Sequence, residues 1–155
     1  MKNQRMLDEL TELMRIDVSS GQETEIAEHL VKKLEQMGFS ITRDEAGATF
    51  GGVCGNVLAV REGERDSVVC FCSHMDRVPG GIGIKPVEED GILRSSGDTI
   101  LAADDLSGVA AILEGVRQAI ESGKALPKLE ILFTVGEEAG LYLSLIHISE
   151  PTRHA

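Results

Sequence analysis

The chain has 155 residues and a mass of 16.7 kDa, the size of one domain or of a part of a larger one. Its composition, 42% hydrophobic and 26% charged, is that of a globular protein and excludes wholesale disorder. The 15 basic and 26 acidic residues give a net charge of −11, which argues against nucleic acids and membranes as partners because both attract clustered basic charge.

Export and membrane insertion are not expected either. No apolar run reaches the roughly 18–20 residues that a membrane span needs, and residues 1–20 lack the apolar centre of a signal peptide. The three cysteines, Cys54, Cys70 and Cys72, cannot all pair, so we expect reduced, buried thiols. Together these features predict a cytoplasmic protein.

The first part of the chain predicts two amphipathic helices. Apolar residues at helical spacing indicate a helix over about 3–16. Ser20 and Glu23 match a capping box, and the apolar stripe beyond them predicts a second helix over about 22–37. Gly38 then stands where a left-handed residue would end that helix.

Short strands and a third helix follow. We expect strands at 39–43, 56–61, 67–73 and 129–135, a hairpin of 85–88 against 92–95, and a helix over about 106–122. The continuous apolar run SVVCFCS at 67–73 predicts a strand that is buried on both faces of a parallel sheet. Strands separated by helices indicate an α/β fold, in which helices flank a mixed, largely parallel sheet.

The end of the chain breaks this pattern. Residues 143–155 begin LSLIHISEPTR, which resembles the translation of a sequencing adapter. We interpret them as a non-native tail that follows a natural sequence ending near Tyr142, and therefore assign no function to His147 or His154.

Three polar clusters follow predicted strands or begin the third helix, where open α/β sheets bind their ligands. The first is His74 with Asp76. Side chains alternate along an extended chain, so both project to the same side. A carboxylate in that position orients a metal-binding histidine by accepting its second N–H. Alone, the pair is more typical of a surface contact between the two side chains than of a metal site.

The second cluster is Asp104 with Asp105, at the start of the predicted third helix. Aspartate is a favoured N-cap and complements the helix dipole, so capping alone explains one of the two. The other is then expected to face outward toward a cation.

The third cluster is Glu137 with Glu138, between Gly136 and Gly140. Adjacent glutamates point in different directions in most backbone geometries. One of them can therefore ligate a metal while the other takes a proton from water. A solvated acidic turn is the alternative interpretation.

Together the three clusters describe a cation site. One histidine and several carboxylates without cysteine ligands favour Zn, Mn or Co, and a carboxylate shared by two cations makes a two-metal site feasible. The glycine-rich segments match neither the dinucleotide fingerprint nor the Walker loop, and no G-x-S-x-G motif is present.

The segments HMDRVPGGIGIKP, TILAADDLSGVAAILE and LFTVGEEAGLY resemble the di-zinc exopeptidases of the peptidase T type, over about residues 5–142. The resemblance implies that residues 1–142 are the N-terminal part of a truncated catalytic domain, without the lid domain that binds substrate and dimerises. It also implies a cis peptide bond at Asp104–Asp105.

Residue roles follow from the same resemblance. His74 corresponds to a ligand of one zinc ion, and Asp76 to the carboxylate that orients it. Asp104 corresponds to the carboxylate that bridges both metals. Glu137 corresponds to the general base, and Glu138 to a terminal ligand of the other zinc ion.

The resemblance implies an aminopeptidase that cleaves short peptides, tripeptides among them, with two divalent ions that are zinc or else manganese or cobalt. A deacylase or desuccinylase of acyl-amino acids and a non-catalytic metal-binding fragment are the alternatives. The family's further aspartate and distant histidine ligands have no counterpart in residues 1–142. We therefore expect this chain to be inactive, with an unpaired apolar sheet edge, and the full-length protein to be a homodimer.

Overall fold

The fold is taken from a computed structural model, in which residues 4–140 are described. The tail expected at residues 143–155 lies outside the described residues. The helices are α1 (Gln4–Met14), α2 (Thr24–Gln36) and α3 (Ala103–Glu121), with a short 3-10 helix η1 (Ala46–Phe50). The strands are β1 (Ser40–Arg43), β2 (Val57–Arg61), β3 (Arg65–His74), β4 (Pro86–Glu89), β5 (Ile92–Ser95) and β6 (Pro127–Thr134).

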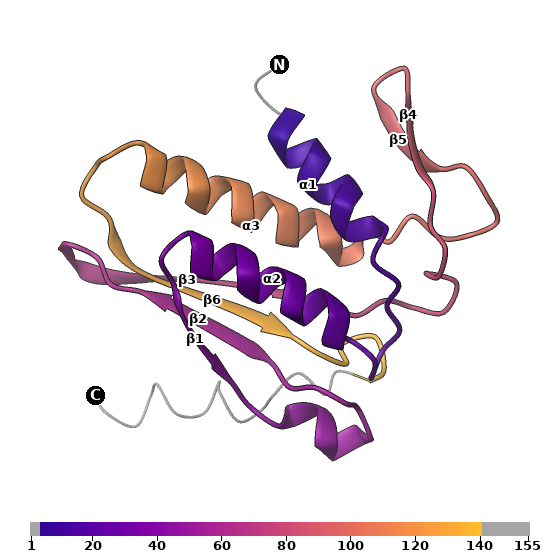
Figure 1. Ribbon diagram of the computed structural model, residues 1–155, viewed down its shortest axis with the longest axis horizontal. Helices are drawn as coiled ribbons and strands as arrows, with labels where there is room; N and C mark the ends of the chain where they lie inside the picture. Colours follow the sequence, from indigo (N-terminus) through magenta and orange to yellow (C-terminus); the bar gives the residue numbers. More distant parts are fainter. Residues whose placement is uncertain (1–3, 141–155) are drawn as a thin grey trace.

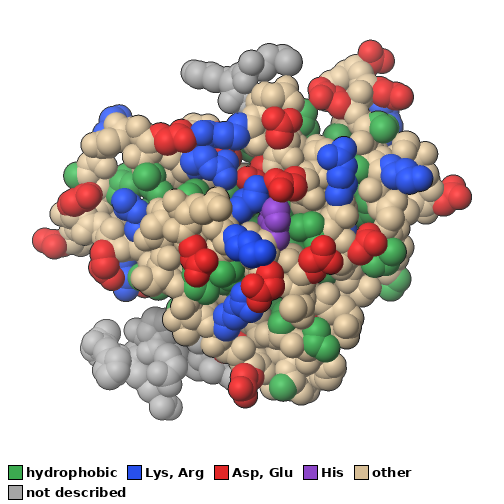
Figure 2. Space-filling model, in the orientation of Figure 1, with side chains coloured by type: hydrophobic (Ala, Val, Ile, Leu, Met, Phe, Trp, Pro, Cys, Tyr) green, Lys and Arg blue, Asp and Glu red, His purple; other side chains and the backbone are tan. Residues whose placement is uncertain are grey.

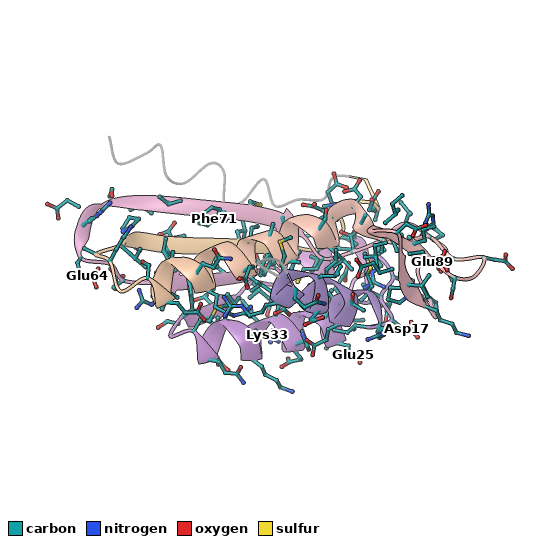
Figure 3. All side chains as sticks on the ribbon, turned by 90° about the horizontal axis from the view of Figure 1, so that it is seen from above. Asp17, Glu25, Lys33, Glu64, Phe71 and Glu89 are labelled. Atoms are coloured by element: carbon teal, nitrogen blue, oxygen red, sulfur yellow. The ribbon has the colours of Figure 1, made fainter. Side chains whose placement is uncertain are left out.

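Four strands form one sheet in the order β1-β2-β6-β3, and α1, α2 and α3 cover one of its faces (Figures 1 and 3). The predicted hairpin is also present, because β4 pairs with β5 in a separate two-stranded sheet that projects away from the main one (Figure 1). The expected α/β fold with a mixed sheet is confirmed. The parallel share is smaller than expected, since β1–β2 and β2–β6 are antiparallel and β3–β6 alone among the described pairings of this sheet is parallel.

The core lies between the helices and the inner face of the sheet. Alternate residues of β6, namely Leu129, Ile131 and Phe133, are 5%, 0% and 0% exposed, as a strand with one covered face requires. The helices contribute Leu13, Ile26, Leu30, Leu34, Leu106, Val109 and Leu113, all fully buried. Gly38 ends α2 with a φ of +83°, as predicted.

The prediction that residues 67–73 are buried on both faces is wrong. Strand β3 has β6 as its one neighbour among the described strands, so it forms the sheet edge. Val68, Val69 and Phe71 are 57%, 39% and 36% exposed, and Figure 3 shows Phe71 on this outer strand. Among the described strands, the apolar edge expected from the sequence is therefore unpaired.

The cysteine prediction is wrong for two residues for the same reason. Cys70 and Cys72 lie on β3 and are exposed, whereas Cys54 is partly buried. All three are free thiols.

The capping box predicted at the start of α2 is also wrong. The Ser20 hydroxyl donates to Asp76 Oδ2 at 2.6 Å instead of capping the helix. The Glu23 side chain accepts the N–H groups of Gly21 and Gly136, and makes no capping bond to α2. Ser20 therefore bonds to a residue distant in sequence, and Glu23 bonds to the distant Gly136 as well as to the nearby Gly21.

The lengths and apolar character of the described helices can be compared with what a membrane span requires. Within residues 4–140, none is both long and apolar enough to cross a membrane.

Candidate metal centre

The parallel pairing of β3 with β6 brings two of the predicted clusters to one edge of the sheet. His74 is the last residue of β3 and lies in register with Thr134, the last residue of β6. The residues that follow each strand therefore emerge side by side. Helix α3 begins at the same edge, because the Ser73 hydroxyl donates to Asp105 Oδ2 at 2.7 Å.

Asp76 is the buried anchor of this arrangement, with 0% exposure. Its Oδ1 lies 3.3 Å from His74 Nδ1. Its two oxygens accept the N–H groups of Glu137 and Glu138 at 3.0 and 2.9 Å, and Oδ2 also accepts the Ser20 hydroxyl. Asp76 thus holds the acidic turn by two hydrogen bonds and lies directly beside the histidine ring.

Asp104 and Asp105 divide capping and outward exposure between them, as the sequence predicted. Asp105 Oδ1 accepts the N–H of Gly108 at 3.1 Å and so caps the regular part of α3. Asp104 has a side chain that is 85% exposed, and its Oδ1 lies 3.1 Å from His74 Nε2. The peptide bond between the two aspartates is cis, as the resemblance implied.

The acidic turn after β6 completes the site. Gly136 has a φ of +68°, and a Cβ there would lie 2.5 Å from the Phe50 ring, so both the conformation and the space require glycine. Glu138 then reaches His74 and Asp104: one ligand atom from each lies within 4.8 Å of the other two. Glu137 belongs to the same turn but is not one of these three.

The electrostatics of the site favour a positive charge at its centre. The Asp76 carboxylate, and after it Asp104, raises the pKa of His74 to about 9, even though partial burial opposes this. Burial and the neighbouring charge of Glu137 raise the pKa of Glu138. Burial also acts to raise the pKa of Asp76, but its hydrogen bonds outweigh burial and lower it.

The donor set fits a divalent cation. Ligand atoms about 2.1 Å from a tetrahedral zinc ion lie about 3.4 Å from one another, close to the 3.1 Å between His74 Nε2 and Asp104 Oδ1. Asp76 lies beside Nδ1, which leaves Nε2 directed at Asp104. His74, Asp104 and Glu138 would therefore hold the ion.

The structure adds supporting residues that the sequence analysis did not assign to the site. Ser20 contacts Asp76, Glu23 contacts the Gly136 turn, and Ser73 contacts Asp105. Only Ser20 and Glu23 carried a signal, and their capping-box spacing pointed to a local partner instead of a distant one.

A second histidine and carboxylate cluster lies between α1 and α2. Ligand atoms of Glu9, Glu12 and His29 also lie within 4.8 Å of one another. The Lys33 ammonium, however, is 2.7 Å from an oxygen of each glutamate, and Arg117 is 3.0 Å from Glu9. These cations already neutralise the carboxylates, and Figure 2 shows the same interleaving of acidic and basic side chains over this face of the molecule.

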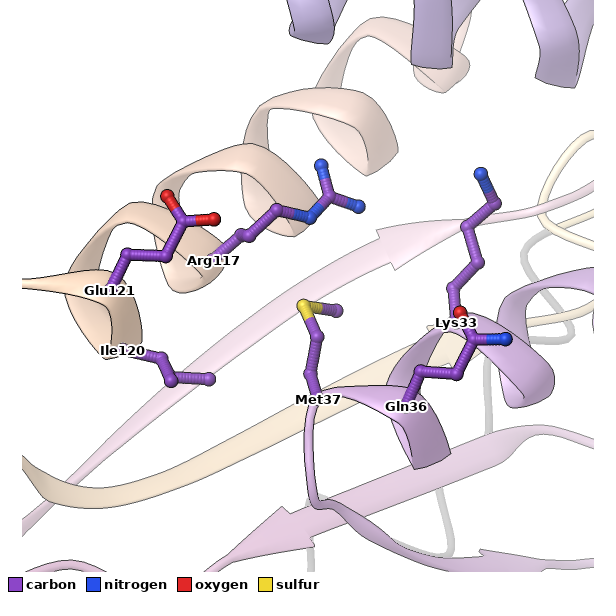
Figure 4. A pocket seen from close by; sticks show the side chains of 6 residues that line it. All are labelled: Lys33, Gln36, Met37, Arg117, Ile120 and Glu121. Atoms are coloured by element: carbon purple, nitrogen blue, oxygen red, sulfur yellow. The ribbon is translucent and has the colours of Figure 1, made fainter.

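A cavity of about 380 Å³ lies at the C-terminal ends of α2 and α3 (Figure 4). It is lined by Lys33, Gln36, Met37, Arg117, Ile120 and Glu121. Asp105 and Glu121 are at opposite ends of α3, about 24 Å apart at 1.5 Å per residue. This cavity is therefore remote from the candidate metal centre.

Comparison with known proteins gives the relationships of the whole chain. The sequence model of peptidase family M28 matches residues 56–154. The Bacillus subtilis protein YqjE, described as uncharacterized, is 36% identical over 142 residues, which are 91% of this chain and 38% of that protein.

Two solved structures of peptidases are also similar to this chain. The aminopeptidase PepT from Bacillus cereus matches with a TM-score of 0.85 and 36% identity, over 89% of this chain and 38% of that one. A tripeptidase from Staphylococcus aureus matches with a TM-score of 0.85 and 34% identity, over 90% and 38%. The resemblance to the peptidase T type is confirmed, and the chain spans 38% of the length of these relatives.

Proposed function

The chain belongs to peptidase family M28, and on that premise we propose that it contributes the metal-binding part of an aminopeptidase that hydrolyses short peptides. The observation that carries the proposal is the convergence of His74, Asp104 and Glu138 beside the buried Asp76. The names of two similar structures, an aminopeptidase and a tripeptidase, support tripeptides among the substrates.

Each side chain has a distinct part in this proposal. Asp76 Oδ1, 3.3 Å from Nδ1, would orient the His74 ring so that Nε2 points at the centre. The exposed Asp104 carboxylate, 3.1 Å from His74 Nε2, would be the ligand common to the two ions. Zinc, or else manganese or cobalt, would supply Lewis acidity, which polarises a carbonyl group and lowers the pKa of water.

Glu137 is the proposed general base. Asp76 fixes its backbone N–H, and its carboxylate contributes to the raised pKa of His74, so it lies close enough to act electrostatically on the centre. A carboxylate in this position takes a proton from the attacking water and passes it to the leaving amine.

The test measures tripeptide hydrolysis by the whole protein in the presence of zinc or manganese. Glu137→Gln should lower kcat by about 100-fold or more while bound metal, measured by atomic emission, stays unchanged. Glu89→Gln, an exposed glutamate at the end of β4, is the matched control and should keep the wild-type rate. A normal rate in Glu137→Gln would remove Glu137 as the base.

Two further assays test the substrate class and the activity of the 155-residue chain by itself. An acyl-amino acid hydrolysed in preference to the tripeptide would replace the aminopeptidase assignment by a deacylase. The 155-residue chain alone is proposed to be inactive, and turnover by it would contradict that part of the proposal.

A further inference from the structure

Glu23 is a buried carboxylate that the proposed chemistry does not use. It is 0% exposed, and burial raises its pKa. Its Oε1 accepts the N–H of Gly21 at 2.7 Å and that of Gly136 at 3.2 Å, while Oε2 lies 4.0 Å from Cys54 Sγ. Within residues 4–140, no Lys or Arg forms an ion pair with it.

The Gly136 bond places Glu23 against the turn that carries the acidic residues. Three consecutive N–H groups of this turn are held by two buried carboxylates, since Glu23 accepts from Gly136 and Asp76 accepts from Glu137 and Glu138. The direction in which Glu138 leaves the sheet is therefore set by both acceptors.

The segment formed by residues 20–23 contacts both halves of the centre. Ser20 donates to Asp76, which lies beside the His74 ring, and Glu23 holds the Gly136 turn. This segment therefore adds a second link between the strand-end histidine and the turn after β6, beside the direct one through Asp76. Burying a carboxylate without a cation lowers the stability of the fold, and its hydrogen bonds offset only part of this loss. An apolar side chain of similar volume would be expected to stabilise the fold more, so stability alone does not explain a glutamate here.

We propose that Glu23 is a positioning residue that holds the Gly136 turn so that Glu138 faces His74 and Asp104. The inference rests on the proposed function, because it concerns the same centre. Glu23 touches neither the ion nor the substrate, and acts through the backbone of the turn.

The test compares three variants. Glu23→Met removes the acceptor at similar volume, and Glu23→Gln keeps an acceptor oxygen without the charge. Glu9→Met is the matched control, since Glu9 is an equally buried glutamate, 4% exposed, in the cluster between α1 and α2. The readouts are amide hydrogen exchange at residues 136–138 by NMR, and Co²⁺ affinity from visible absorption.

Glu23→Met should speed exchange at residues 136–138 relative to the amides of β6, and should weaken Co²⁺ binding by about tenfold or more. Glu23→Gln should restore both readouts. Glu9→Met should lower stability but change neither. Should Glu23→Met fail to fold, Glu23→Asp replaces it, because it draws the carboxylate back by one methylene group and is expected to act in the same direction.

The inference is overturned if the acceptor-deficient variant exchanges residues 136–138 at the wild-type rate, or if Glu9→Met shows the same change. Absence of Co²⁺ binding by the wild-type chain would instead contradict the proposed metal centre. Amide exchange would then still decide the role of Glu23, so the two failures are distinguishable.

Discussion

Two clusters in this molecule each bring one histidine and two carboxylates within 4.8 Å, one at the end of β3 and one between α1 and α2. In the helical cluster, Lys33 contacts both glutamates and Arg117 contacts one. At the strand end, no Lys or Arg in the described part of the chain forms an ion pair with His74, Asp104 or Glu138.

The difference shows that residue type alone does not make a metal site. In the helical cluster, Lys33 of α2 and Arg117 of α3 neutralise the carboxylates through ion pairs. The strand-end cluster leaves negative charge uncompensated beside a histidine whose pKa is raised to about 9 by Asp76 and Asp104. A divalent cation would replace the proton that this environment otherwise favours.

The largest expected effect is on metal affinity, which should depend on the strand-end cluster and not on the helical one. Asp104→Ala should weaken Co²⁺ or Zn²⁺ binding by about 100-fold or more, because even the partners of metal ligands are worth about 10–100-fold. Glu12→Ala, in the helical cluster, should leave the affinity unchanged. Isothermal titration measures both, and equal losses in the two variants would break the comparison.

The second prediction concerns stability, for which the helical cluster should show the larger effect. Lys33→Met leaves the Glu9 oxygen that faces Lys33 buried without its cation, which should cost about 1–3 kcal/mol of unfolding free energy. Asp104→Ala changes a side chain that is 85% exposed, and should stay within about 0.5 kcal/mol. Urea unfolding measures both, and a larger loss in Asp104→Ala would be the contrary result.

The smallest expected effect concerns acid stability, at the network next to the helical cluster. Hydrogen bonds from Arg5, followed by those from Gln118 and Arg117, lower the pKa of Glu114 to about 2, from an ordinary value of 4.5. A carboxyl pKa lowered by folding stabilises the protein above its unfolded pKa, and this stabilisation is lost as the pH falls toward 2.

Arg5→Met should therefore flatten the fall in stability between about pH 4.5 and 2. The change is small because the Arg5 side chain is 44% exposed and solvent screens the pair. Arg94→Met, on the exposed strand β5, is the control and should keep the wild-type slope. Parallel slopes in all three proteins would show that Arg5 contributes nothing to the acid response.

Much of the fold could be predicted because its signals are local. Apolar residues at helical spacing predicted α1, α2 and α3 to within a few residues, and alternation predicted β6. The approach of the polar clusters could also be expected, since they follow strands or begin a helix. The roles of the site residues remain predictions, namely those of His74, Asp76, Asp104, Glu137 and Glu138.

What the sequence could not predict depends on neighbours. The apolar run of β3 looks the same at the edge or the centre of a sheet, so its exposure was missed. Ser20 and Glu23 have the spacing of a capping box, but Asp76 and Gly136 take their side chains. Asp76 is 56 residues from Ser20, and Gly136 is 113 residues from Glu23, so a local sequence pattern could not predict these contacts.

A crystal of the chain grown with Zn²⁺, with diffraction collected at the zinc absorption edge, would test the metal centre directly. We expect an anomalous peak between His74, Asp104 and Glu138, and none at Glu9, Glu12 and His29. A peak confined to the helical cluster, or no peak at the end of β3 under saturating Zn²⁺, would contradict the proposed metal centre.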